Sequence, residues 1–153
     1  MALINRKPLA RTEGLFSEEV NDEVLVYDEN DMIACRLNQT AAFVWSKCDG
    51  KRTVPALVEL LRAEYGEHAD EDMLLIALDE LAARELIESG YERRESGAAK
   101  FSRRRFLRRV GIASIGTALL PIVYSIAIPA PAAASSGFMY HNNYFPYLPD
   151  TQL

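Results

Sequence analysis

The spacing of apolar positions predicts a short sheet near the beginning of the chain. Residues 24–27 form an apolar run between two polar, acidic clusters, and residues 33–37 form a second apolar run after the second cluster. Short runs bounded by turn-forming residues are typical of strands, and their closeness in sequence predicts an antiparallel hairpin. Residues 9–16 carry a weaker strand signal, which would add a third strand.

The pattern then changes to helical spacing and predicts three helices. The first begins at Asn38 or Gln39 and ends at Gly50, because apolar residues recur at helical intervals between these points. The second begins after Thr53, a candidate N-cap. The third begins near Asp70, where acidic residues suit the positive end of the helix dipole, and continues to residue 87. Strands followed by three helices indicate a small α+β domain.

Charge divides the chain into two parts. Residues 1–95 hold 11 Lys and Arg against 21 Asp and Glu, whereas residues 96–153 hold 6 against 1. The stretch 93–101 has the composition of a linker. Residues 110–128 contain no charge, and as a helix they would reach roughly 28 Å, close to the thickness of the hydrocarbon core of a bilayer. This run predicts a hydrophobic helix with a kink at Pro121.

One combination of residues in the acidic part resembles a known family. It joins a Leu-Asn pair after the second strand to a helical tryptophan and a Cys-Asp-Gly helix end, namely Leu37, Asn38, Trp45, Cys48, Asp49 and Gly50. Over residues 24–88 the chain resembles the PqqD family, small peptide-binding proteins named for coenzyme PQQ synthesis. The family fold, called the RiPP recognition element, also occurs in other pathways that make ribosomally synthesised, modified peptides. The resemblance implies a winged helix with a three-stranded antiparallel sheet and three helices.

The resemblance also implies a mode of action. Members of the family bind a leader peptide as an added strand, at the exposed sheet edge beside the third helix. Unpaired backbone groups on an edge strand and an apolar helix face suit this role. The candidate peptide-binding residues carried onto this chain are Ile33, Ala34, Cys35, Arg36, Leu37, Met73, Leu74, Ala77 and Leu81. The competing interpretation is that the apolar residues of the third helix are core.

The residue content argues against catalysis. Cys35, Cys48 and the two histidines are not expected to form a structural zinc site, and no phosphate loop, nucleophile elbow or HExxH motif is present. Asp49 before Gly50 is typical of a helix stop and turn rather than of a general base. We therefore predict no enzyme activity, no metal and no cofactor. Nucleic acid is not expected as a partner, because the acidic domain would repel phosphate.

The arginine cluster matches the pattern of a twin-arginine export signal. It comes directly before the apolar run, and the candidate signal residues are Arg103, Arg104, Phe106 and Leu107. A small-residue stretch after the run places a candidate cleavage site at Ala132 and Ala134. Two alternatives are an ordinary membrane anchor and a buried helix of a soluble domain. In both membrane interpretations the arginines keep the N-terminal side in the cytoplasm.

These features predict a PqqD-like domain at 1–92, a linker at 93–101, a signal or anchor helix at 102–134 and a flexible tail at 135–153. The predicted function is non-enzymatic binding of a leader peptide and its presentation to a modifying enzyme, for example of the radical SAM type. The domain would be cytoplasmic and tethered to the membrane, with the twin-arginine translocase as a further partner. The alternative is a peptide precursor fused to its own recognition domain, whose tail is modified and exported. A third interpretation is a membrane-bound assembly part without a peptide ligand.

Overall fold

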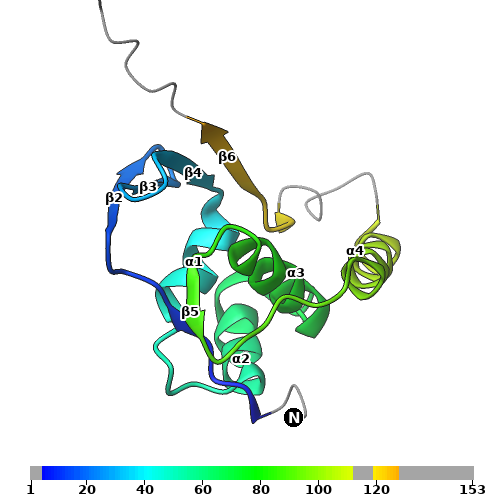
Figure 1. The fold of residues 1–153 in the computed structure, drawn as a ribbon. Helices are drawn as coiled ribbons and strands as arrows, with labels where there is room; N and C mark the ends of the chain where they lie inside the picture. Colours follow the sequence, from blue (N-terminus) through cyan, green and yellow to red (C-terminus); the bar gives the residue numbers. More distant parts are fainter. Residues whose placement is uncertain (1–4, 112–118, 128–153) are drawn as a thin grey trace, which may run out of the picture.

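The computed structural model describes residues 5–111 and 119–127. Figure 1 shows a twisted sheet on one side and a group of helices on the other. The elements in chain order are β1 (Leu9–Ala10), β2 (Leu15–Val20), β3 (Glu23–Asp28), β4 (Ile33–Leu37), α1 (Gln39–Lys47), α2 (Val54–Tyr65), α3 (Glu71–Ala82), β5 (Ile87–Ser89), α4 (Ser96–Val110) and β6 (Val123–Ala127).

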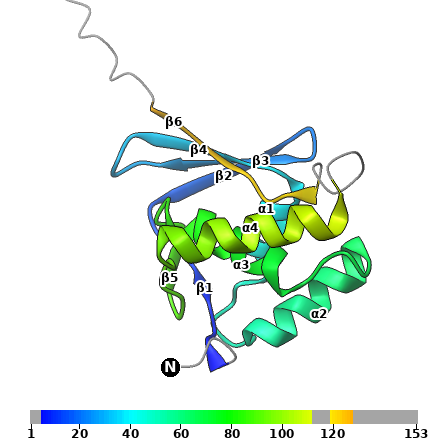
Figure 2. The ribbon, with the colours of Figure 1, turned by 90° about the vertical axis from the view of Figure 1, so that its right-hand side faces the viewer.

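The larger sheet has four antiparallel strands in the order β2-β3-β4-β6. A two-residue turn at Asn21 and Asp22 joins β2 to β3, and both residues have positive φ, as a type I′ hairpin turn requires. Within the sheet Cys35 of β4 lies between Val26 of β3 and Ser125 of β6. Figure 2 shows β6 beside the larger sheet, where it pairs with β4, although the two strands lie far apart in sequence.

Polar side chains confirm two of the predicted helix starts. The side chain of Asn38 accepts a hydrogen bond from the N–H of Ala41 at the start of α1. Asp70 accepts one from the N–H of Met73 at the start of α3. Both contacts satisfy donors that a helix end otherwise leaves without a partner. The apolar faces of α1, α2 and α3 pack against one another, and α1 also packs against β3 and β4. The fully buried side chains include Val26, Leu37, Val44, Leu61, Leu74, Leu78 and Leu81.

The observed elements differ from the prediction in two places, one in the strands and one at the end of the third helix. The weak strand signal at 9–16 corresponds to two strands: β1 pairs with β5 in a separate two-stranded sheet, and β2 is an edge of the larger sheet. Helix α3 ends at Ala82, before its predicted end at Ile87. Glu85 has a positive φ, and the N–H of Leu86 returns to the C=O of Leu81, so the chain turns there and enters β5.

Helix α4 packs on α3 and belongs to the folded domain (Figure 2). Residues 96–101, predicted as part of a linker, are its first turns. The side chain of Phe106 is fully buried in the core. The composition suggested a linker because α4 is mostly polar, and its packing depends on a few apolar residues, chiefly Phe106, and on ion pairs with α3.

The prediction of a hydrophobic helix over residues 110–128 is wrong for the part that the structure describes. Helix α4 ends at Val110, and residues 123–127 form strand β6. Within residues 5–111 and 119–127, no helix combines the length and the apolar character needed to cross a bilayer. Pro121 lies buried just before β6 and kinks no helix. The β-branched side chains around it favour the extended conformation.

Candidate functional site

The outer edge of β4 is the centre of the candidate site. The N–H of Asn38 donates to the C=O of Ile122 at 3.1 Å. Hydrogen-bonded pairs alternate along an antiparallel ladder, so the N–H groups of Ala34 and Arg36 point toward β6, whereas that of Cys35 points toward β3. On its outer side β4 therefore offers backbone donors and acceptors to an added strand, and β6 takes this place.

Neighbouring side chains of β6 point to opposite faces of the sheet, and among residues 123–126 only Val123 is buried. Val123 is 3% exposed and belongs to the core, whereas Tyr124 and Ile126 are exposed on the opposite face. The guanidinium of Arg36 lies over the ring of Tyr124, at 5.2 Å from its centroid. A cation–π contact at an exposed position contributes about 0.5–1 kcal/mol. One buried aliphatic side chain and one surface contact therefore accompany the backbone pairing.

Asn38 holds the segment that leads into β6. Its Nδ2 donates to the C=O of Leu120 at 2.8 Å, and its Oδ1 accepts from the N–H of Ile122 at 3.1 Å. The same Oδ1 accepts from the N–H of Ala41 and caps α1. The side chain of Asn38 thus caps α1 and at the same time forms hydrogen bonds with the backbone that leads into β6.

Arg84, in the turn after α3, contacts β6 from a second direction. Its Nε donates to Ser125 Oγ at 2.6 Å, and its Nη2 donates to the C=O of Val123 at 3.2 Å. Ser125 Oγ also lies 3.8 Å from the Sγ of Cys35. Because the donor is charged, these hydrogen bonds are stronger than neutral ones. The end of α3 and the edge of β4 therefore both contribute to the recognition of β6.

A cavity of about 220 Å³ lies beside these contacts. The inner face of β3 and β4, the turn after α3 and one residue of β6 line it, including Val26, Ile33, Cys35, Arg84, Leu86 and Ser125. A strand at the position of β6 could place a larger side chain there. Backbone pairing along an edge, combined with a pocket for alternate side chains, is one of the recurring ways in which proteins bind extended peptides.

Residues 23–87 match the family described as Coenzyme PQQ synthesis protein D (PqqD). We refer to this matched segment as the PqqD domain. The match begins with β3 and ends at the first residue of β5, so it includes β4 and the helices α1, α2 and α3. The family suggests a role in recognising the leader peptide of a ribosomally synthesised peptide. No curated protein and no solved structure matches the chain.

The PqqD domain places the predicted peptide-binding residues in two different environments. Ile33, Ala34, Cys35, Arg36 and Leu37 form β4 and lie along the edge that β6 occupies. The predicted residues of the third helix, Met73, Leu74, Ala77 and Leu81, are fully buried. These four side chains of α3 pack in the core and present no surface to a peptide. This is what the competing core interpretation expects.

Two residues that contact the added strand were missed by sequence reasoning. Asn38 was predicted only as a helix start, although an asparagine between an edge strand and a helix is also well placed to bond a strand beside it. Arg84 follows α3 and matches no motif. Its role depends on the fold, which brings the end of α3 opposite β6, so no local signal could have identified it.

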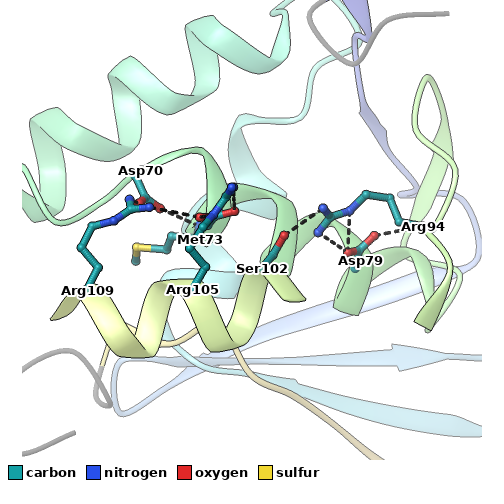
Figure 3. Close-up of polar contacts among 8 residues, drawn as sticks. Asp70, Met73, Asp79, Arg94, Ser102, Arg105 and Arg109 are labelled. Carbon is teal, nitrogen blue, oxygen red and sulfur yellow. Dashed lines mark hydrogen bonds and ion pairs between the residues drawn. The ribbon is translucent and has the colours of Figure 1, made fainter. Parts of the chain in front are cut away.

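The arginines after the linker pair with acidic residues of α3 (Figure 3). Arg105 makes a bidentate contact with Asp72, with both distances at 2.5 Å, and the side chain of Asp72 is almost fully buried. Arg109 contacts Asp70 and Asp72. The positive charge of α4 is therefore matched in part by the negative charge of the PqqD domain.

The twin-arginine pattern lies within α4. Arg103 approaches Glu80 at 3.8 Å, Arg104 is exposed, and Leu107 packs partly buried against the core. Export through this motif and tethering to a membrane stay predictions. The candidate cleavage residues Ala132 and Ala134, with the predicted tail, lie outside the described residues.

A buried carboxylate joins α3 to the residues that lead into α4. Asp79 accepts from Arg94 Nε at 2.9 Å, from Arg94 Nη2 at 2.6 Å and from the Tyr91 hydroxyl at 2.8 Å (Figure 3 shows the Arg94 contacts). Arg94 also donates to Ser102 Oγ at 3.0 Å. Burial, together with the charge of Asp79, raises the pKa of Tyr91, so this hydroxyl stays a donor. The network fixes the position of α4 on the PqqD domain.

The Cys-Asp-Gly element has a structural role. Asp49 accepts from the N–H groups of Lys51 and Arg52 at 2.9 and 3.0 Å, and Gly50 has a φ of 72°, so the pair forms the predicted turn. Burial, with the nearby charge of Asp49, raises the pKa of Cys48 to about 12, which leaves a protonated, poorly nucleophilic thiol. Among residues 5–111 and 119–127, no cluster of His, Cys, Asp and Glu is suited to hold a metal ion.

Proposed function

We propose that the PqqD domain of this chain binds an extended leader peptide as an added strand on the outer edge of β4. In this proposal the chain itself carries out no chemistry. It holds the peptide for a separate modifying enzyme, for example of the radical SAM type. The support for this partner is the family match, since PqqD is named for a role in cofactor synthesis.

A single observation carries the proposal. The outer edge of β4 accepts an antiparallel strand over five paired positions, from Ile33 opposite Ala127 to Leu37 opposite Val123. Asn38 and Arg84 add side-chain hydrogen bonds to that strand, and a cavity lies beside it. Backbone pairing supplies affinity for an extended peptide, and side chains supply its selectivity.

The experiment uses the full chain with Tyr124→Pro and a fluorescent synthetic peptide with the sequence of residues 119–127. Proline at position 124 removes the N–H that pairs with β4 and so frees the edge. We expect saturable binding of the peptide, measured by fluorescence anisotropy. Adding Arg36→Pro should weaken binding roughly ten-fold or more, because it removes an edge donor of β4 while edge strands tolerate proline.

The matched control is Arg36→Ala in the same Tyr124→Pro chain. This change removes the same side chain, with its contact to Glu23, but keeps the backbone donor. We expect it to retain most of the affinity. Equal affinities for the Arg36→Pro and Arg36→Ala chains, with both chains folded by circular dichroism, would refute strand addition at this edge.

A second candidate function is a peptide precursor fused to its own recognition domain. What supports it is that residues 123–127 of the same chain already lie at the proposed site. The test is the intact mass of the chain, tagged at its N-terminus and recovered from its native host. Loss of the residues after Ala134, or a mass change confined to them, is expected if the chain is a precursor. An unmodified, full-length chain would count against this candidate.

A further inference from the structure

The last described segment of the chain, residues 119–127, lies outside the PqqD match and yet reaches the centre of the proposed site. The match ends at Ile87, so α4 and β6 are additions to the matched domain. Helix α4 is anchored on α3 by Phe106 and by the pairing of Arg94 with Asp79. From this anchored helix the chain returns to β4 within a few residues.

The contacts of this segment are more specific than sheet pairing alone. Leu119 and Leu120 pack against the core, and Asn38 bonds the backbone on both sides of Pro121. Arg84 bonds the next part of the segment, at the carbonyl of residue 123 and the hydroxyl of residue 125. Two polar side chains of the matched domain are therefore satisfied by the added segment, in addition to the backbone of β4.

We propose that residues 119–127 are a built-in ligand of the peptide site: the domain recognises a strand of its own chain. This inference rests on the proposed function, because it identifies the occupant of the edge where a leader peptide is expected. A peptide from another molecule binds at β4 only after β6 has left.

Because β6 belongs to the same chain as β4, it competes strongly for the edge of β4. A ligand that belongs to the same chain binds intramolecularly, and over a short connection its effective concentration is on the order of millimolar. Here the connection runs only from Gly111, at the end of α4, to Leu119. A free peptide of equal intrinsic affinity and micromolar concentration would therefore lose the competition.

The contacts also define the kind of strand that the site accepts. It has a buried aliphatic residue at the position of Val123, which is 3% exposed, and a small hydroxyl residue at the position of Ser125, within reach of Arg84. The cavity beside Ser125 is left unfilled by β6. A competing peptide with a larger apolar side chain at that position would gain a contact that β6 does not make.

Amide hydrogen exchange of the full chain tests the occupancy. In the unchanged protein the amides of Ala34 and Arg36, which point to β6, should exchange as slowly as that of Cys35, which points to β3. Tyr124→Pro should speed exchange at Ala34 and Arg36 roughly ten-fold or more and leave Cys35 protected. Tyr124→Ala keeps the backbone donor and is the matched control, which should change little. Fast exchange at Ala34 and Arg36 in the unchanged protein would refute the built-in ligand.

A second measurement separates this inference from the proposed function. The fluorescent peptide of residues 119–127 should bind the Tyr124→Pro chain roughly ten-fold or more tightly than the unchanged chain, where β6 competes. If the unchanged chain binds it equally well and its edge amides exchange fast, the built-in ligand is refuted and strand recognition stands. If the edge amides respond to Tyr124→Pro but no peptide binds, the proposed function is refuted and β6 is an ordinary structural strand.

Asn38→Asp supplies a third, independent variant. Aspartate retains a side-chain oxygen that can cap α1 but loses the Nδ2 donor to the C=O of Leu120. If Asn38 recognises the built-in ligand, this variant keeps its fold, while its edge amides exchange faster and its affinity for the free peptide changes with them. Unchanged exchange at Ala34 and Arg36 would overturn the assignment of Asn38.

Discussion

Replacing Phe106 by alanine should destabilise the whole domain, because α4 is part of its core. The Phe106 side chain is 0% exposed, although it lies in a helix that is otherwise mostly polar. Truncation of a fully buried phenylalanine costs about 3–5 kcal/mol, from lost burial and from the cavity left behind. Small domains are stable by only about 5–15 kcal/mol, so this is a large fraction of the free energy of unfolding.

Phe101 provides the control on the same helix. Its side chain is 62% exposed and contacts the Arg105 guanidinium at 5.5 Å from the ring centroid. We expect Phe101→Ala to lower the free energy of unfolding by no more than about 1 kcal/mol. Both variants replace a phenylalanine of α4 by alanine, so they differ only in how deeply the replaced side chain is buried.

Urea unfolding of the full chain, followed by circular dichroism, measures both effects. With a slope of about 1–3 kcal/mol per molar urea, Phe106→Ala should lower the midpoint by roughly 1–5 M. The midpoint of Phe101→Ala should stay close to that of the unchanged chain. If the two variants unfold at the same urea concentration, α4 does not belong to the cooperative unit, and the placement of the arginine cluster on α3 is wrong.

Three further outcomes follow from buried polar groups. Asp79→Asn should lower the free energy of unfolding by about 3–5 kcal/mol in urea titrations, because it leaves Arg94 buried without its partner; adding Arg94→Gln should restore part of the loss. Cys48 should resist a disulfide reagent such as DTNB at pH 8 until the protein unfolds, since burial raises the pKa of its thiol to about 12. Burial alone would raise the pKa of Asp28, but hydrogen bonds, chiefly from the Asn30 N–H, hold it below its usual value. Its contribution to stability is therefore present above about pH 4 and lost as the pH falls further, so Asp28→Asn should flatten the acid side of the stability profile.

Much of the PqqD domain could be predicted because its signals are local. The β3–β4 hairpin is two apolar runs separated by a polar turn, and the starts of α1 and α3 are set by Asn38 and Asp70, whose side chains bond the first turn. The turn at Asp49 and Gly50 likewise depends on neighbouring residues only. For these elements the contacts that decide the structure lie within a few positions in sequence.

The C-terminal part could not be predicted in the same way. A short apolar run has the same pattern in a buried strand and in a buried or membrane helix, so periodicity does not separate them. The partner of β6 is β4, which lies far earlier in the chain. The β-branched residues near Pro121 were the signal for a strand, but the arginine cluster before them favoured a membrane interpretation. That cluster pairs instead with Asp72 and Glu80 of α3, which a sequence pattern does not reveal.

The most direct test of peptide recognition at β4 is hydrogen exchange of the Tyr124→Pro chain with and without the free peptide of residues 119–127. This measurement locates the bound strand as well as detecting it. If the peptide pairs with β4, the amides of Ala34 and Arg36 become protected again when it is added, and those of β2, the opposite edge of the sheet, stay unchanged. Binding that leaves Ala34 and Arg36 unprotected, or that protects β2 instead, would contradict the account.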